Sequence, residues 1–156
     1  MEVIDQEITR SRLDNINCRL FYPGTALALF KILDTFEIDI RGAETVVVGQ
    51  SRQVGYPISL LLRRLGASVT TCEGSTKLCD LESAVGRADI VVSATGKIDP
   101  FDARLLKQGS CLIDVGFNWD DRKEQFRGDV DFSLAVERCA LLSLIPGGIG
   151  PVNASV

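Results

Sequence analysis

Residues 45–57 read Thr-Val-Val-Val-Gly-Gln-Ser-Arg-Gln-Val-Gly-Tyr-Pro and decide the fold that we expect for this chain. The β-branched run at residues 45–48 is typical of a strand buried inside a parallel sheet. Gly49 and Gly55 follow with Ser51 between them, and the apolar residues 58–65 predict a helix. Strand, glycine turn and helix form the layout of a dinucleotide-binding loop, where a helix N-terminus offers free N–H groups to a pyrophosphate.

The spacing of this loop leaves a second interpretation open. The pattern is G-x-S-x-x-x-G, whereas the usual dinucleotide-binding pattern is G-x-G-x-x-G. A plain connection between a strand and a helix, with glycines needed only for packing, would show the same residues. The order of motifs along the rest of the chain favours the binding loop.

Composition and charge narrow the classes of function. The chain has 156 residues, enough for one domain with a sizeable core, and 46% of them are hydrophobic. A net charge of −4 gives no electrostatic argument for binding nucleic acid or an anionic membrane. No apolar run approaches the roughly 20 residues of a membrane span. We therefore expect a cytoplasmic protein with no nucleic-acid or membrane partner.

The reactive side chains argue against a metal site or a cysteine nucleophile. The sequence contains no histidine, and its five cysteines are scattered, with none at C-x-x-C spacing. Zinc sites and Cys-His pairs need those residues. We expect no metal, and we interpret the thiols as buried and reduced.

Strands and helices alternate along the chain. We expect strands at residues 45–48, 68–72, 89–94, 110–115 and 141–145. Helices are expected at 25–33 with Thr25 as the cap, and at 58–65, 78–85, 102–108 and 131–138, the last capped by Asp131. Residues 117–128 look like a surface excursion or a hairpin. The alternation predicts an α/β fold, a Rossmann-type doubly wound, mainly parallel sheet with helices on both faces.

Ligands of such sheets bind at the carboxyl ends of the strands. Those ends break here at Gly49, Glu73, Thr95-Gly96 and Gly116. We interpret Lys97 as a surface lysine and Asp114 as a strand-end carboxylate that bonds nearby backbone. Asp129 and Asp131 are interpreted as a turn residue and a helix cap.

Taken together, the motifs resemble the nucleotide-binding domain of methylenetetrahydrofolate dehydrogenase/cyclohydrolase. The matching segments follow that family's order and lie at residues 23–25, 47–57, 75–78, 88–97, 113–118, 128–132 and 146–151. The resemblance implies a nicotinamide cofactor and a folate substrate. In that family the folate lies between this domain and an N-terminal catalytic domain that carries a lysine and a tyrosine. We assign residues 23–156 to the NAD(P)-binding domain and residues 1–22 to a lead-in arm.

The resemblance places the cofactor along the carboxyl edge of the sheet. The expected cofactor-binding residues are Gly49, Gln50, Ser51, Val54, Gly55, Glu73, Thr95, Gly96, Gly116 and Asn118. Among these, Ser51, Val54 and Gly55 would hold the pyrophosphate through backbone N–H groups and a hydroxyl. By family analogy, the folate cleft would be faced by Pro146, Gly147 and Gly148. No catalytic residue is expected in this chain, so the chain alone should not run the full reaction.

Gln50 and Glu73 bear on the choice of cofactor. Gln50 stands where the family usually has an arginine, and Glu73 follows the second strand. An acidic residue there accepts hydrogen bonds from the ribose 2′-hydroxyl of NAD and repels the 2′-phosphate of NADP. We therefore expect NAD in preference to NADP, although Arg52 and the more remote Lys77 could offset the carboxylate. A solvated loop carboxylate is the alternative interpretation of Glu73.

Two functions stay open from the sequence. One is the dinucleotide-binding domain of a methylenetetrahydrofolate dehydrogenase/cyclohydrolase, an oxidoreductase and hydrolase of one-carbon metabolism. The other is a non-catalytic nucleotide-binding or interaction module related to that family, which the altered residues 23–26, Gln50 and Asn153 favour. A homodimer is compatible with both, because we expect apolar surface that would meet a further domain to be exposed, and the resembled family commonly dimerises through this domain.

Overall fold

A single five-stranded sheet forms the centre of the molecule. The computed structural model describes residues 22–143. The strands are β1 (Glu44–Val48), β2 (Ser68–Cys72), β3 (Ile90–Ser93), β4 (Cys111–Asp114) and β7 (Leu141–Leu142). All neighbours are parallel, and the spatial order is β2-β1-β3-β4-β7. The expected α/β fold with a doubly wound parallel sheet is confirmed.

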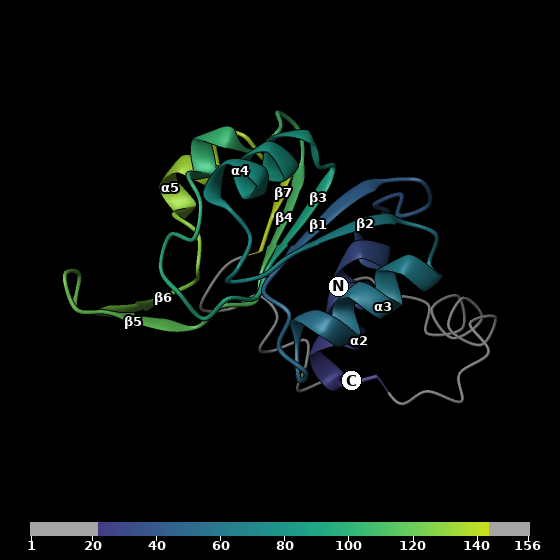
Figure 1. The fold of residues 1–156 in the computed structure, drawn as a ribbon, viewed down its shortest axis with the longest axis horizontal. Helices are drawn as coiled ribbons and strands as arrows, with labels where there is room; N and C mark the ends of the chain where they lie inside the picture. Colours follow the sequence, from purple (N-terminus) through teal and green to yellow (C-terminus); the bar gives the residue numbers. More distant parts are fainter. Residues whose placement is uncertain (1–21, 144–156) are drawn as a thin grey trace, which may run out of the picture.

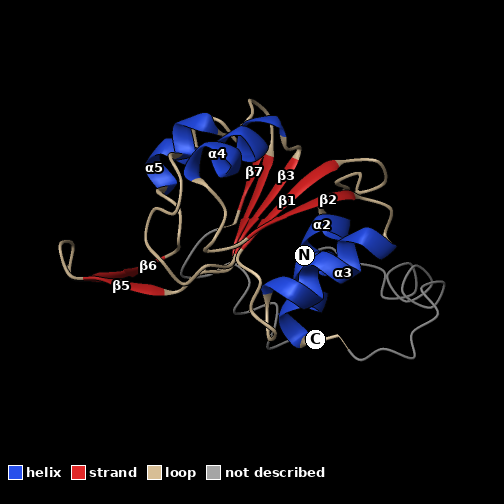
Figure 2. Ribbon diagram, viewed as in Figure 1, coloured by secondary structure: helices blue, strands red, loops and turns tan. Residues whose placement is uncertain are grey.

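Helices cover both faces of the sheet (Figure 1). Helices α2 (Gly24–Thr35) and α3 (Gly55–Arg64) lie on one face. The other face carries α4 (Leu78–Arg87), the 3-10 helix η1 (Ala103–Leu105) and α5 (Phe132–Ala135). The strands β5 (Asn118–Asp120) and β6 (Gln125–Arg127) pair as an antiparallel hairpin that reaches out from the body of the domain (Figure 2).

Nearly every residue of the central strands β1, β3 and β4 is buried, because helices cover both faces of the sheet; within these three strands only Glu44, at the start of β1, is exposed. Along β1, Val47 packs in the core under α2 and α3, whereas Val46 and Val48 pack in the core under α4. β3 and β4 alternate in the same way, because successive side chains of a strand point to opposite faces. The unbroken β-branched run in the sequence follows from this two-sided burial.

Several element bounds differ from the sequence-based expectation. Helix α2 begins at Gly24 without a side-chain cap, so the expected cap by Thr25 is wrong. Helix α3 begins at Gly55 and includes Pro57, because a proline in the first turn lacks only an N–H that would have no helical partner. The helices expected at 102–108 and 131–138 are shorter, as η1 and α5. Residues 144–145 of the last expected strand lie outside the described residues.

The excursion expected at residues 117–128 contains the β5–β6 hairpin. Among the described helices, none combines the length and the apolar composition needed to cross a membrane.

Asp131 caps α5 as expected, and its removal gives a test of this local structure. Its carboxylate accepts hydrogen bonds from the backbone N–H groups of Ser133, at 2.9 Å, and Leu134, at 3.3 Å. We predict that Asp131→Ala lowers the free energy of unfolding by about 1 kcal/mol at neutral pH, measured by urea denaturation. Glu137→Ala removes an exposed carboxylate nearby and should have little effect.

The effect of Asp131→Ala should also depend on pH. The hydrogen bond from the Ser133 hydroxyl, assisted by the two backbone N–H groups, holds the pKa of Asp131 below its usual value. Folding therefore favours the ionised form, and its stabilisation is present above the ordinary aspartate pKa of about 4 and lost as the pH falls below it. The cost of the substitution should shrink in acid, and a cost that grows in acid would contradict the cap.

Candidate functional site

The predicted site residues gather at one edge of the sheet. The chain leaves β1 for β2 on one side and then returns to β3 on the other side of β1. Such a switch in direction opens a crevice at the carboxyl ends of the two strands. The predicted cofactor-binding residues all follow the carboxyl ends of four neighbouring strands. They are Gly49, Gln50, Ser51, Val54 and Gly55 after β1, Glu73 after β2, Thr95 and Gly96 after β3, and Gly116 and Asn118 after β4.

The loop between β1 and α3 packs tightly against its neighbours. Gly49 has a φ of +94°, and a Cβ at this position would overlap the carbonyl oxygen of Ala94. A Cβ at Gly55 would overlap the carbonyl oxygen of Gly49. Both glycines are therefore required by packing, as the second interpretation of the sequence held, whatever the loop binds.

Several backbone N–H groups of the same loop have no hydrogen-bond acceptor among the described residues. The N–H groups of Ser51, Arg52, Gln53 and Gly55 donate no hydrogen bond to any residue within 22–143. They lie at the N-terminal end of α3, where the partial positive charge of the helix favours an anion. The chemistry of these donors fits a phosphate group. Val54 differs, because its N–H already bonds the Ser51 hydroxyl at 3.2 Å.

Three side chains set the charge around this loop. The Gln50 amide turns inward, where its Nε2 donates to the Gly49 carbonyl at 2.9 Å and to the Ser59 hydroxyl at 3.1 Å. Glu73 and Arg52 are exposed, and Arg52 forms no ion pair with any residue of the described part of the chain. An exposed guanidinium therefore lies in the segment after β1 and an exposed carboxylate in the segment after β2, with a neutral amide between the loop and α3.

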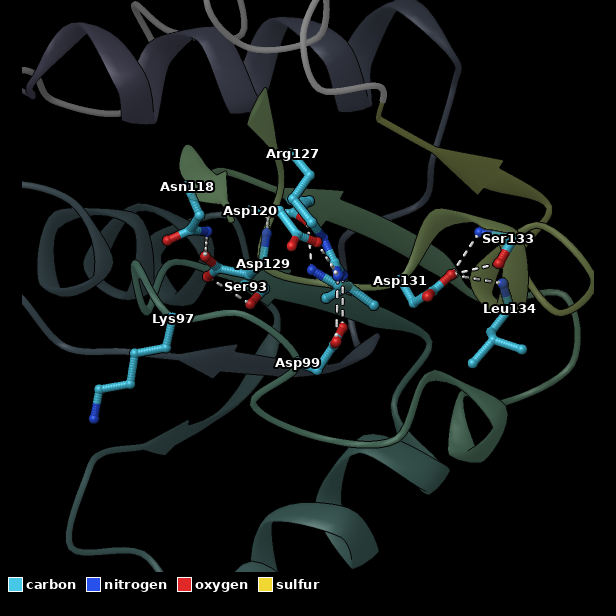
Figure 3. A network of polar contacts seen from close by, with 12 residues as sticks. Ser93, Lys97, Asp99, Asn118, Asp120, Arg127, Asp129, Asp131, Ser133 and Leu134 are labelled. Carbon is cyan, nitrogen blue, oxygen red and sulfur yellow. Dashed lines mark hydrogen bonds and ion pairs between the residues drawn. The ribbon is translucent and has the colours of Figure 1, made fainter. Parts of the chain in front are cut away.

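The Asp129 side chain forms a buried hydrogen-bond network that the sequence did not reveal. It is fully buried, and its carboxylate accepts hydrogen bonds from the hydroxyl of Ser93 (3.0 Å), the N–H and hydroxyl of Thr95 (2.7 and 2.8 Å) and the amide of Asn118 (2.9 Å) (Figure 3). Asp129 lies in a bend of the chain, in line with its interpretation as a turn residue, but that interpretation missed the contacts of the side chain. Asp129 joins the end of β3 to the start of the hairpin. Ser93 and Thr95 are 36 and 34 residues away, so no local pattern could reveal these contacts.

A second buried carboxylate, that of Asp114, lies beside Asp129. It accepts hydrogen bonds from the N–H groups of Gly116, Asp129 and Val130 at 2.9, 3.1 and 2.9 Å, in agreement with the sequence-based interpretation. Burial raises the pKa of Asp114, the three N–H groups oppose this shift, and the nearby Asp129 carboxylate adds to it. A Cβ at Gly116 would overlap Asp129, and one at Gly128 would overlap Asp114. Gly116 is thus required by packing.

The remaining site predictions are less informative. Lys97 is exposed, and its side chain points away from the buried network (Figure 3), as expected for a surface lysine. Residues 22–143 contain no cluster of three or more histidine, cysteine, aspartate or glutamate side chains placed to bind a metal. Pro146, Gly147 and Gly148, the expected folate-facing residues, lie outside the described residues.

Known proteins with similar sequences share this domain. Residues 23–156 match the family model for the NAD(P)-binding domain of tetrahydrofolate dehydrogenase/cyclohydrolase. The bifunctional protein FolD of Paraburkholderia phytofirmans is 41% identical over 137 residues, which cover 88% of this chain and 47% of that protein. The chain therefore spans about half the length of the curated relatives that it matches.

Solved structures agree with these matches. The bifunctional FolD methylenetetrahydrofolate dehydrogenase/cyclohydrolase of Campylobacter jejuni superimposes with a TM-score of 0.82 at 33% identity, over 87% of this chain and 47% of that one. The Trypanosoma brucei methylenetetrahydrofolate dehydrogenase-cyclohydrolase, solved with NADP and an inhibitor, gives 0.80 at 35% identity, over 86% of this chain and 47% of that one.

The packing of the glycine loop can be tested at Gly49. We predict that Gly49→Ala lowers the free energy of unfolding by about 2 kcal/mol or more, because a side chain there is strained by the positive φ and overlaps Ala94. Gly86→Ala is the matched control, since a Cβ at this position of α4 would lie 3.4 Å from the Leu105 carbonyl oxygen, an ordinary contact, and a helical alanine is favoured over glycine by about 1 kcal/mol. Urea denaturation that shows equal effects for the two variants would contradict the packing argument.

Proposed function

The chain belongs to the tetrahydrofolate dehydrogenase/cyclohydrolase family through its NAD(P)-binding domain, and on this premise we propose that it is the nucleotide-binding part of a methylenetetrahydrofolate dehydrogenase/cyclohydrolase. The observation that carries this proposal is the set of free N–H groups in the β1–α3 loop at the switch point of the sheet. The proposed domain is residues 23–156, which the matched range supports, with residues 1–22 as a lead-in arm.

The described residues have defined roles in this proposal. A bound nicotinamide dinucleotide supplies the hydride chemistry. The N–H groups of Ser51, Arg52 and Gly55 would donate to its phosphates, and the residues after β3 and β4 would border its far end. Folate would need the family's catalytic lysine and tyrosine from a further domain. This domain alone should therefore bind cofactor without turning over folate.

We propose that the domain prefers NAD to NADP. The Glu73 carboxylate is exposed at the end of β2, where it can accept hydrogen bonds from the adenosine ribose and would repel a 2′-phosphate. The Gln50 amide is held by Ser59 and offers no positive charge. Arg52 is the cation that could offset this preference.

Calorimetric titration of the chain with NAD and NADP tests both proposals. We predict that NAD binds about tenfold more tightly, and that Glu73→Gln narrows this difference by improving NADP binding. Glu137→Gln removes an exposed carboxylate elsewhere and should leave the ratio unchanged. NADP binding equal to or tighter than NAD binding would end the preference argument. Binding of neither dinucleotide would favour the non-catalytic module.

We also propose that the domain forms homodimers through the β5–β6 hairpin. The rings of Phe117 and Phe126 stack with centroids 4.6 Å apart, and Trp119 meets Phe126 edge-on. About half or more of the surface of each residue is exposed, at 61% for Phe117, 50% for Trp119 and 49% for Phe126. Burying such a contiguous aromatic surface against a second copy would be favourable.

Analytical ultracentrifugation tests the dimer. We predict that the chain sediments as a dimer and that Trp119→Asp weakens self-association by about tenfold or more, because it places a charge in the aromatic surface. Phe36→Asp changes an equally exposed aromatic residue at the end of α2, remote from the hairpin in sequence, and should leave association unchanged. A wild-type chain that stays monomeric at every concentration would contradict the proposal.

The state of the cysteines bears on the location of the protein in the cell. Cys72, Cys79, Cys111 and Cys139 are free thiols, which supports a reducing compartment, and we propose the cytoplasm.

A further inference from the structure

The buried Asp129 carboxylate has an unusual set of partners. All four of its hydrogen-bond donors are neutral groups, from Ser93, Thr95 and Asn118. No lysine or arginine within residues 22–143 forms an ion pair with it. The neighbouring Arg127 is engaged with Asp99 and Asp120 instead. A buried charge without a cation is stable only if its oxygens are fully hydrogen-bonded, so the orientation of every donor around it is fixed.

The two oxygens of Asp129 have different tasks. Oδ2 receives three bonds, from the Ser93 hydroxyl and from the N–H and hydroxyl of Thr95, and so anchors the carboxylate to the end of β3. Oδ1 receives the side-chain amide of Asn118. In addition, the backbone N–H of Asp129 is held by Asp114 at 3.1 Å. These hydrogen bonds together hold the Asp129 carboxylate in a single orientation.

This orientation decides which way the Asn118 amide faces. An ionised carboxylate can only accept hydrogen bonds, so the NH2 group of Asn118 must face Asp129 and the amide oxygen must face away. Figure 3 shows this oxygen on the side of Asn118 remote from Asp129. No donor within the described residues bonds it. Asn118 thus presents a free acceptor in the segment that follows β4.

We propose that Asp129 is a positioning residue that holds the Asn118 oxygen outward as the acceptor for the carboxamide N–H of the nicotinamide ring. The inference rests on the proposed function. Asp129 itself is fully buried and does not touch the cofactor; it acts through Asn118. Recognition of the nicotinamide end is in this way separate from the phosphate donors of the β1–α3 loop.

Asp129→Asn tests this inference because it inverts the outward group while keeping the shape of the side chain. The three donors at Oδ2 require the oxygen of the introduced amide, so its NH2 group must face Asn118. Asn118 must then turn, and it presents NH2 in place of oxygen. We predict that NAD or NADP, whichever binds more tightly to the wild type, loses about tenfold in affinity by calorimetry. ADP-ribose, which lacks the nicotinamide ring, or its 2′-phosphate where NADP is used, should bind as before.

Two further variants separate positioning from a general loss of structure. In the Asp129→Asn background, Asn118→Asp restores an outward oxygen and an acceptor for the introduced amide, and should recover part of the lost affinity. Asp120→Asn is the matched control, because it neutralises another buried carboxylate, at the end of β5, one that bonds Arg122, Lys123 and Arg127. It should change stability without changing the affinity for the dinucleotide.

The outcomes separate this inference from the proposed function. If the wild type binds neither dinucleotide, both are overturned. If the wild type binds and Asp129→Asn binds equally well, or loses ADP-ribose binding to the same extent, only the positioning role is overturned. Should Asp129→Asn fail to fold, Ser93→Ala replaces it, because this buried hydroxyl anchors Oδ2. It should weaken dinucleotide binding and leave ADP-ribose binding unchanged, and unchanged dinucleotide binding would overturn the role.

Discussion

The close approach of the β1–α3 loop to the end of β3 is the constraint on which the rest of the structure depends. Gly49 packs against the Ala94 carbonyl and Gly55 packs against Gly49, with no space for a side chain at either glycine. This contact holds the segments that follow β1 and β3 together at the switch point of the sheet. Because the loop is held there by packing, Ser51 and its neighbours keep their backbone N–H groups free of internal partners. The close packing of the two glycines and the free N–H groups of the loop are therefore both results of the same loop conformation.

Buried carboxylates organise the other half of the same edge. Asp114 and Asp129 are tied to one another and to the segments after β3 and β4 by hydrogen bonds from neutral donors. A hydrogen bond to a charged group contributes about 1.5–3 kcal/mol. The exposed ion pair between Lys107 and Asp89 contributes little to stability, because water screens its charges. The interior network, although it contains no cation, therefore does more than the surface ion pairs to fix the geometry of the site.

The sequence predicted those parts of the molecule that depend on local pattern. The apolar run of β1, the alternation of strands and helices, the cap at Asp131 and the bond from the Gly116 N–H to Asp114 follow from residues near one another in the chain. The bonds that Asp114 accepts from Asp129 and Val130 join residues 15 and 16 positions apart. Asp129 could not be interpreted in this way. Its Gly-Asp context is typical of a turn, and two of its three partners lie more than thirty residues away. Likewise, only the fold shows that position 116 must be glycine because a Cβ there would overlap the Asp129 carboxylate.

Under the proposed function, the fold and the cofactor preference depend on different atoms of this domain. The groups that hold the loops together are buried, namely the glycine contacts and the two carboxylates. Arg52 and Glu73, whose charges we propose to distinguish NAD from NADP, are both exposed. Gln50 stands between these classes, because replacing it with a cation would lose its bond to Ser59 at a cost of about 1 kcal/mol. That cost is small beside the free energy of folding, so cofactor preference can change in this fold while the packing of the crevice stays the same.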